Sequence, residues 1–180
     1  MANGNEVPEK VAWVLIRDDR VLVTRSHGRD RFYFPGGHRE PGESDGETLV
    51  REIDEELRAV IDPNSMVHSG TFEIGEGHPE HGPFRMICYT ADHRGELTPS
   101  REIAEKAWFR YADRNRVSAV DEMVFDTLHA AGRLPDPVTA AQQQRSTRPQ
   151  RPQMVLGNHL AHACPHGRLS SDPVGLASNS

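Results

Sequence analysis

The sequence predicts a mixed α/β (α+β) fold, in which a mixed β-sheet packs against helices. Segments rich in β-forming residues alternate with turn signals, and two further segments combine helix-capping residues with apolar side chains at helical spacing. Their order along the chain, β-β-β-α-β-β-β-α, is typical of layered folds that mix both element types. The 180 residues allow one ordinary domain, with or without a tail, and are too few for two full-sized domains.

A hairpin and a short aromatic strand open the predicted sheet. Residues 11–17 and 21–24 are rich in β-forming side chains, and the Asp-Asp pair at 18–19 between them signals a turn. Residues 32–34, Phe-Tyr-Phe, indicate a third strand, which Pro-Gly-Gly at 35–37 stops. These segments supply the first three predicted strands.

The strongest helix signal in the chain begins at Ser44. Ser44 followed three residues later by Glu47 is a capping box, in which each side chain bonds the backbone N–H of the other residue. Leu49, Ile53 and Leu57 then recur at four-residue spacing and form one apolar stripe. We therefore expect a helix from Ser44 whose stripe faces the sheet.

Three more strands and a second helix complete the pattern. Residues 67–74 and 84–91 indicate two strands joined by a loop rich in Gly and His, and residues 107–111 indicate the last strand. Ser118 predicts the start of a second helix, and Gly132 predicts its end. The apolar side of this helix carries Val120, Val124, Phe125 and Leu128.

Composition separates a folded domain from the end of the chain. Residues 135–180 contain six of the 13 Pro and no Phe, Trp or Tyr, so they have little apolar surface to offset the conformational entropy lost on folding. We therefore expect a domain over residues 10–134, a flexible N-terminus over 1–9, and a disordered Pro/Arg/Gln/Ser-rich tail over 135–180. The net charge of −6 divides into −8 for residues 1–134 and +2 for the tail.

Charge and cysteine usage narrow the classes of function. An acidic chain offers no electrostatic basis for general nucleic-acid binding, which needs a basic face. No apolar run approaches the roughly 20 residues of a membrane span, and the first residues show no signal-peptide pattern, so we expect no membrane partner. Two Cys, 76 positions apart, form no disulfide framework and indicate a cytoplasmic location. His159, His162, Cys164 and His166 lack the paired spacing of a zinc site.

Three glutamates on the first predicted helix form a cluster that favours metal binding. Glu52, Glu55 and Glu56 lie at positions i, i+3 and i+4, so they share one arc of the helix beside its apolar stripe. Glu43, just before the cap, can fold back towards the same place. An isolated cluster of this kind is usually a solvated acidic face. Near a core, a divalent cation would neutralise it, and ligation by oxygen alone selects Mg²⁺ or Mn²⁺.

The surrounding residues extend this cluster into a longer fixed pattern. Gly37 is followed after five residues by Glu43, and after seven more by the run Arg-Glu-Ile-Asp-Glu-Glu at 51–56. From average residue usage, a chance match in such a chain is on the order of one in a million. In this pattern the sequence resembles the Nudix hydrolase family over residues 10–134, with the Nudix box at 37–59.

The resemblance implies a Nudix αβα sandwich with a mixed central sheet. It also implies hydrolysis of a nucleoside diphosphate linked to a group X, with Mg²⁺ or Mn²⁺ as cofactor. One box position departs from the family, because Arg58 stands where the family usually has a Gly that ends the helix in a left-handed conformation. Either the helix runs further, or Arg58 carries mild strain.

The same resemblance assigns roles to the charged residues of the box. Glu52, Glu55 and Glu56 would be the metal ligands. Arg51 would orient these carboxylates through an ion pair. Glu43 would complete the charge network or reach a metal through water.

The general base stays open between two glutamates. Glu52 is one candidate. Glu102, on the loop six residues before Trp108, is the other, since related enzymes carry an extra glutamate there that faces the metals. Glu105 is a weaker third choice, and the alternative for both loop residues is an exposed pair without a catalytic role.

Substrate recognition is expected outside the metal ligands. Arg25 and Arg31 precede the aromatic strand and are candidates to meet phosphates, against the simpler interpretation of a basic loop. Gly37 and His38, inside the box, are further candidates. The compact domain favours a nucleoside triphosphate as substrate over ADP-ribose or a nucleotide sugar. The rival hypothesis from another class is a non-catalytic Nudix-like domain that binds a nucleotide and regulates a partner. Many relatives dimerise, so the resemblance also allows a homodimer.

Overall fold

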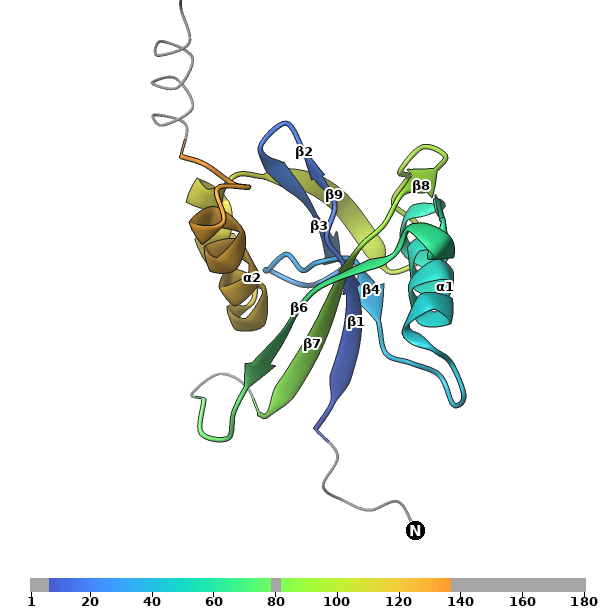
Figure 1. Ribbon diagram of the computed structural model, residues 1–180, viewed down its shortest axis with the longest axis horizontal. Coiled ribbons are helices and arrows are strands. Elements are labelled where there is room, and N and C mark those ends of the chain that lie inside the picture. Colours follow the sequence, from blue (N-terminus) through green and yellow to red (C-terminus); the bar gives the residue numbers. More distant parts are fainter. Residues whose placement is uncertain (1–6, 79–81, 137–180) are drawn as a thin grey trace, which may run out of the picture. The chain divides into compact units, whose positions relative to one another are not determined.

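A computed structural model describes residues 7–78 and 82–136, which fold into strands and helices (Figure 1). The strands are β1 (Glu9–Trp13), β2 (Ile16–Arg17), β3 (Arg20–Ser26), β4 (Gly36–Gly37), β5 (Val60–Ile61), β6 (Val67–Ile74), β7 (Phe84–Thr90), β8 (His93–Arg94) and β9 (Ile103–Phe109). The helices are α1 (Asp45–Leu57) and α2 (Ala119–Ala130), with short 3₁₀ helices at Pro63–Ser65 and Tyr111–Arg116. Neither α-helix of these ranges is long and apolar enough to cross a membrane.

Three sheets share the strands. The largest has the order β4-β1-β7-β6, with β1 and β7 parallel and the other neighbours antiparallel. A second, antiparallel sheet has the order β2-β3-β9, and β5 pairs with β8 in a small third one. The parallel pairing within an otherwise antiparallel arrangement confirms the predicted mixed sheet.

Helices cover the strands from two sides, with α1 on one side and α2 on the other (Figure 1). Alternation along β1 explains how one strand serves both layers. Val11 and Trp13 pack in the apolar cluster of α1, whereas Ala12 and Val14 pack in the cluster of α2. All four side chains are almost fully buried. The expected αβα sandwich is therefore confirmed.

The first predicted hairpin is wrong in its first half. Residues 11–17 do not form one strand: the chain leaves the large sheet after Trp13 and enters the second sheet at Ile16. The true hairpin joins β2 to β3 through Asp18 and Asp19, both of which have positive φ, as a two-residue turn of type I′ requires. β-propensity alone could not reveal that one apolar run divides between two sheets.

The predicted aromatic strand at 32–34 is also wrong. Phe32 and Tyr33 form only isolated bridges, and the paired strand is β4, at the residues expected to stop it. Gly36 pairs with Ala12, and a Cβ on Gly36 would lie only 2.2 Å from the Val11 carbonyl oxygen. Glycine is therefore present because β4 packs against β1 at a distance that no side chain permits.

Helix α1 begins as predicted, because both bonds of the capping box between Ser44 and Glu47 are present. It ends at Arg58, which adopts the left-handed conformation with φ 55° and ψ 30°. Of the two expectations for this position, the structure shows strain at Arg58 and not a longer helix. The Arg58 N–H still bonds the Asp54 carbonyl at 3.0 Å, which closes the last turn.

Element boundaries differ elsewhere by a few residues. The last strand runs over 103–109, not 107–111, and β1 begins at Glu9, inside the segment 1–9 that was expected to be flexible. Leu134 is fully buried, so the core reaches the predicted domain end. Residues 137–180, which hold nearly all of the predicted tail and its His and Cys residues, lie outside the described residues.

Candidate active site

Helix α1 presents the three box glutamates beside β4. Glu56 is the deepest of them, with 6% of the residue exposed, and its Oε2 atom accepts a hydrogen bond from the Gly36 N–H at 3.1 Å. The side chains of Glu52 and Glu55 are 14% and 26% exposed. The capped helix and the close β4 strand thus bring the carboxylates to one edge of the core.

Burial dominates the electrostatics of Glu56 and raises its pKa to about 7. Lys10 and the Gly36 N–H act in the opposite direction, while the charges of Glu52 and Glu102 raise the pKa further. A buried carboxyl group among other carboxylates is costly to ionise unless a cation offsets the charge. The site therefore favours a positive ligand next to Glu56.

Gly37 leaves the space that Glu52 occupies. A Cβ at position 37 would lie 2.0 Å from Glu52 Oε1 and 2.1 Å from its Cδ, far inside any tolerable contact. The two residues belong to β4 and α1, which lie side by side. Glycine at this box position is thus a steric requirement of the carboxylate behind it.

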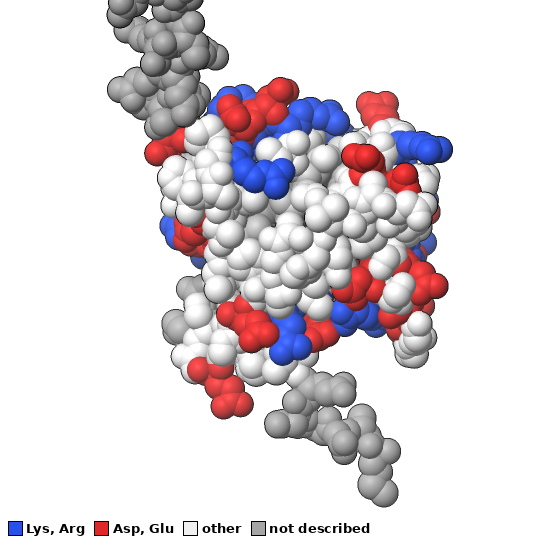
Figure 2. Space-filling view, viewed as in Figure 1, with Lys and Arg blue, Asp and Glu red and all other residues white. Residues whose placement is uncertain are grey.

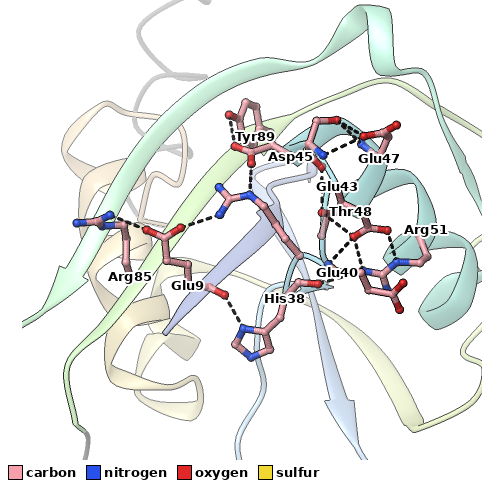
Figure 3. Close-up of polar contacts among 12 residues, drawn as sticks. Glu9, His38, Glu40, Glu43, Asp45, Glu47, Thr48, Arg51, Arg85 and Tyr89 are labelled. Carbon is pink, nitrogen blue, oxygen red and sulfur yellow. Dashed lines mark hydrogen bonds and ion pairs between the residues drawn. The ribbon is translucent and has the colours of Figure 1, made fainter. Parts of the chain in front are cut away.

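Arg51 connects the loop before α1 to the glutamates. Its Nε and Nη2 atoms donate to the two oxygens of Glu43 at 2.7 and 2.8 Å (Figure 3). Its Nη1 atom donates to Glu52 Oε1 at 2.7 Å. Nη2 also donates to the His38 carbonyl at 3.0 Å, and Glu55 Oε2 lies 3.8 Å from Nη1. Glu43 and Arg51 therefore form a bidentate pair, and the same guanidinium also contacts Glu52, one of the three clustered glutamates.

The pKa of Glu43 is lowered to about 2, first by the Arg51 hydrogen bonds and then by the Glu40 N–H, with a further bond from Thr48. This carboxylate stays ionised across the physiological range. Its contacts identify it as part of the charge network around Arg51.

The loop before β9 docks on the end of α1 and brings Glu102 to the site. The Ser100 N–H bonds the Glu56 carbonyl at 2.9 Å, and Arg101 pairs with Glu55 at 2.8 Å. Glu102 follows directly, and its charge acts on Glu56. Glu105 instead pairs with Arg25 at 2.9 Å, outside this group. Glu105 lies in β9 and not in the predicted loop, and Glu102 is the one of the two whose charge acts on a box residue.

Among the described residues, the predicted phosphate-binding arginines, Arg25 and Arg31, form ion pairs with glutamates other than those of α1. Arg25 pairs with Glu105 and stacks over the Phe32 ring at 5.7 Å. Arg31 donates to the carbonyls of Asn115 and Val117 at 3.3 and 2.8 Å. The two guanidinium groups thus attach residues 25–31 to β9 and to the segment before α2.

A pocket of about 700 Å³ adjoins Glu56 and extends to the start of α2. Its lining includes Lys10, Tyr33, His38, Phe84, Ser118 and Asp121. Lys10 donates to the Phe34 carbonyl at 2.8 Å, and the pocket has aromatic groups on its walls. Its size lies within the range of small-molecule sites.

Two polar residues of this pocket had no predicted role in binding. Asp121 is 2% exposed and accepts hydrogen bonds from the Phe34 N–H and the Ser118 hydroxyl, and burial raises its pKa. Lys10 is one of two lysines in the chain and stands directly before an apolar run. A lysine beside an apolar run was the one sequence signal that could have indicated a role for Lys10 in the pocket. Asp121 gave no such signal, because an acidic residue is common in the first turn of a helix.

The glutamates have the chemistry of ligands for a hard divalent cation, since all their donor atoms are carboxylate oxygens. Within residues 7–78 and 82–136, no three acidic, His or Cys side chains form a ready-made metal cage. Glu52 and Glu55 are instead paired with Arg51 and Arg101. Each of these ion pairs uses one carboxylate oxygen, Oε1 of Glu52 and Oε2 of Glu55, so the second oxygen of each is available to a metal while the arginine holds the first.

The sequence over residues 7–125 matches the model of the NUDIX domain. This match covers more than half of the chain, and the chain therefore belongs to the NUDIX family. A relative named as an uncharacterized Nudix hydrolase, YvcI of Bacillus subtilis (strain 168), is 30% identical over 96 residues, which are 53% of this chain and 61% of that protein. The matched segment thus spans less than two thirds of that relative's length.

Solved structures share the fold at low sequence identity. The E. coli ORF135 protein has a TM-score of 0.56 and 23% identity, covering 70% of this chain and 93% of that chain. A NUDIX hydrolase from Nitrosomonas europaea has a TM-score of 0.58 and 20% identity, covering 74% and 95%. These likenesses establish the NUDIX fold of the described domain.

Proposed function

We propose that this protein is an Mg²⁺-dependent pyrophosphohydrolase that cleaves the diphosphate bridge of a nucleoside diphosphate linked to X, with a nucleoside triphosphate as the preferred substrate. The observation that carries the proposal is Glu56, a buried carboxyl group that lines a pocket and whose pKa is raised by burial and by the charges of Glu52 and Glu102. Such a group is expensive to maintain in a domain that only needs to fold. Membership of the NUDIX family supports the same reaction class.

Glu52, Glu55 and Glu56 would hold the metal, and Mn²⁺ could replace Mg²⁺ because both are hard ions. When bound, the metal supplies neutralisation of the pyrophosphate charge and a lower pKa for the attacking water. Arg51 would keep Glu52 oriented towards it. Water then attacks one phosphorus, the bridging P–O bond breaks, and two phosphorylated products leave.

Glu102 is the general base that the contacts favour. Arg51 Nη1 donates a hydrogen bond to Glu52 Oε1 at 2.7 Å, so Glu52 is already engaged with this guanidinium. Glu102 has no ion-pair partner among the described residues, yet its charge reaches Glu56. It can therefore accept a proton from the water without leaving a pair.

The pocket beside Glu56 would take the nucleoside part of the substrate. Tyr33 and Phe84 offer aromatic surface for a base, while Lys10 and Asp121 supply a donor and an acceptor at the polar end. One nucleoside fits a pocket of about 700 Å³. ADP-ribose and nucleotide sugars carry a second large group, which would have to lie outside it.

The test is a substrate panel with the full chain and Mg²⁺: nucleoside triphosphates, oxidised deoxynucleoside triphosphates, ADP-ribose, nucleotide sugars and dinucleoside polyphosphates. We expect a nucleoside triphosphate to give the monophosphate and pyrophosphate, and Glu56→Gln to lower kcat by about 100-fold or more. Glu102→Gln should lower kcat without weakening Mn²⁺ binding. Glu52→Gln should lower kcat and also weaken Mn²⁺ binding. Wild-type protein that turns over no substrate would contradict the proposal, and tight nucleotide binding without turnover would favour the regulatory alternative.

A further inference from the structure

Arg39, in the loop between β4 and α1, joins two elements that are distant from each other in the sequence. Its Nη1 atom lies 2.6 Å from Glu9 Oε2 on β1, and its Nε atom lies 2.5 Å from Asp45 Oδ1 at the start of α1. All three side chains are partly buried, between 23% and 29% exposed, so solvent screens these pairs less than pairs on an open surface. The guanidinium thus ties the loop to the sheet and to the helix.

The two carboxylates that Arg39 contacts are themselves fixed by β7. The Tyr89 hydroxyl donates to Asp45 Oδ2 at 2.7 Å, and Arg85 Nη1 donates to Glu9 Oε1 at 2.5 Å (Figure 3). Arg85 and Tyr89 are four residues apart on one strand, so their side chains leave the same face. The parallel register also pairs Glu9 with Arg85. The sheet therefore supplies a fixed frame, and Arg39 attaches the loop to it.

Both carboxylates remain ionised in this frame. Hydrogen bonds from Arg39 and Arg85 lower the pKa of Glu9. Burial alone would raise the pKa of Asp45, but hydrogen bonds from Arg39 and Tyr89 bring it below its ordinary value. Arg39 consequently bridges two charged acceptors, which gives stronger hydrogen bonds than neutral ones would.

The same loop holds the arginine of the carboxylate site. The carbonyl of His38, the residue before Arg39, accepts a hydrogen bond from Arg51 at 3.0 Å. Glu43, four residues after Arg39, accepts two more from the same guanidinium. Arg51 in turn donates to Glu52. A shift of this loop would move the His38 carbonyl and the Glu43 carboxylate, which both accept hydrogen bonds from Arg51. Arg51 would then move as well, and the Glu52 carboxylate with it.

We propose that Arg39 is a positioning residue for the carboxylate site: it fixes the 38–44 loop so that Arg51 keeps Glu52 in place for a metal ion. The inference rests on the proposed function in that these carboxylates bind a metal, and it gives Arg39 no contact with substrate. Removing outer groups that orient ligands typically changes metal affinity or activity 10- to 100-fold.

The experiment compares Arg39→Met and Arg39→Lys with Arg85→Met in the full chain. Arg85→Met is the matched control, because it also removes an ion pair to Glu9, together with one to Glu73, but leaves both contacts of Arg39 intact. Mn²⁺ binding without substrate is measured by electron paramagnetic resonance. Melting temperature, kcat, KM and the Mg²⁺ concentration for half-maximal rate are measured in parallel.

We expect Arg39→Met to weaken Mn²⁺ binding about tenfold and to lower kcat by a similar factor, with KM little changed. Arg39→Lys, which keeps the charge and one contact, should fall between Arg39→Met and wild type. Arg85→Met should stay within about twofold of wild type in Mn²⁺ binding and kcat, because the pairing of β1 with β7 still holds Glu9 in place and Glu9 keeps its ion pair to Arg39, although the melting temperature falls.

Two results would overturn the inference. One is an Arg39→Met variant with a lower melting temperature but unchanged Mn²⁺ binding and kcat, which would show a purely structural role. The other is an equal loss in Arg85→Met, which would trace the effect to the strands. Should Arg39→Met fail to fold, Arg39→Lys and Asp45→Asn are used instead, because each weakens the contacts of Arg39 with Glu9 or Asp45 without removing both. Their Mn²⁺ binding and kcat then test the positioning role. If wild-type protein binds Mn²⁺ through Arg39-dependent carboxylates but hydrolyses nothing, the proposed function fails and this inference stands.

Discussion

Glu52 owes its position to the lack of a side chain at Gly37, since a Cβ there would lie 2.0 Å from Glu52 Oε1. On its other side, Arg51 holds the same carboxylate at 2.7 Å. Glu56 differs, because its pKa is set mainly by burial and it has no arginine partner among the described residues. Individual residues of the site are therefore fixed by two distinct effects, close packing around Glu52 and desolvation around Glu56.

Gly37→Ala should abolish most activity while leaving a folded protein. The new methyl group would displace the Glu52 carboxylate, and we expect kcat/KM to fall at least about tenfold, as for other losses of ligand orientation. Gly75→Ala is the matched control, because a Cβ there meets no atom within 4 Å. Equal activity of the two variants in a steady-state assay would refute the steric role of Gly37.

Glu56 should make the metal-free protein less stable as the pH rises. Its pKa is about 7 in the folded protein against an ordinary value of 4.5, so its contribution to the unfolding free energy is kept below pH 4.5 and lost as the pH passes 7. The loss is at most about 3 kcal/mol. Denaturation in chelator from pH 4.5 to 8 should show a steeper decline for wild type than for Glu56→Gln. Parallel curves would contradict the burial of an ionisable Glu56.

Added Mg²⁺ should restore stability more at pH 8 than at pH 5.

Helix α1 shows how an element places the site. Its capping box fixes where the helix starts, and the stripe of Leu49, Ile53 and Leu57 fixes which side faces the core. The glutamates then follow from helical periodicity. Its end is less favourable, because Arg58 has φ 55° where glycine would be unstrained.

Arg58→Gly should stabilise the protein. Removing the Cβ relieves the left-handed strain, and we expect a gain of about 1 kcal/mol in the unfolding free energy. Asp54→Gly, an exposed position inside the same helix, is the control and should lose about 0.3 kcal/mol, since aspartate is already a poor helix former. Chemical denaturation measures both. A loss of stability in Arg58→Gly would mean that contacts of the arginine side chain outweigh the strain.

At the scale of the whole described domain, residues 7–78 and 82–136 form a sandwich whose two apolar clusters meet at β1. Charges of both signs lie around the rim of the face in Figure 2, and the centre of that face is uncharged. The described face therefore shows no continuous basic patch. A cytoplasmic location and a homodimer stay predictions from the sequence.

Shortening the chain after Asp136 should leave fold and activity intact. The buried core reaches Leu134, so this cut keeps every buried side chain of the described domain. Ending the chain after Gly132 instead removes Leu134, and we expect that to cost about 2–4 kcal/mol. Melting temperature and turnover of both shortened chains test this. Loss of activity in the longer one would show that the segment after Asp136 takes part in function.

The sequence by itself determined what depends on local spacing. The capping box, the apolar stripe and the run from Arg51 to Glu56 are written within 20 consecutive residues, where helical geometry converts spacing directly into position. That was enough for the NUDIX family, the αβα sandwich and the candidate metal ligands.

Only the tertiary structure decided which distant segments meet. It brought Glu102 to Glu56, joined Lys10 and Asp121 in one pocket, and divided the first apolar run between two sheets. It also placed Arg39 between Glu9 and Asp45. These contacts depend on strand pairing and packing across many residues, and no local propensity encodes them.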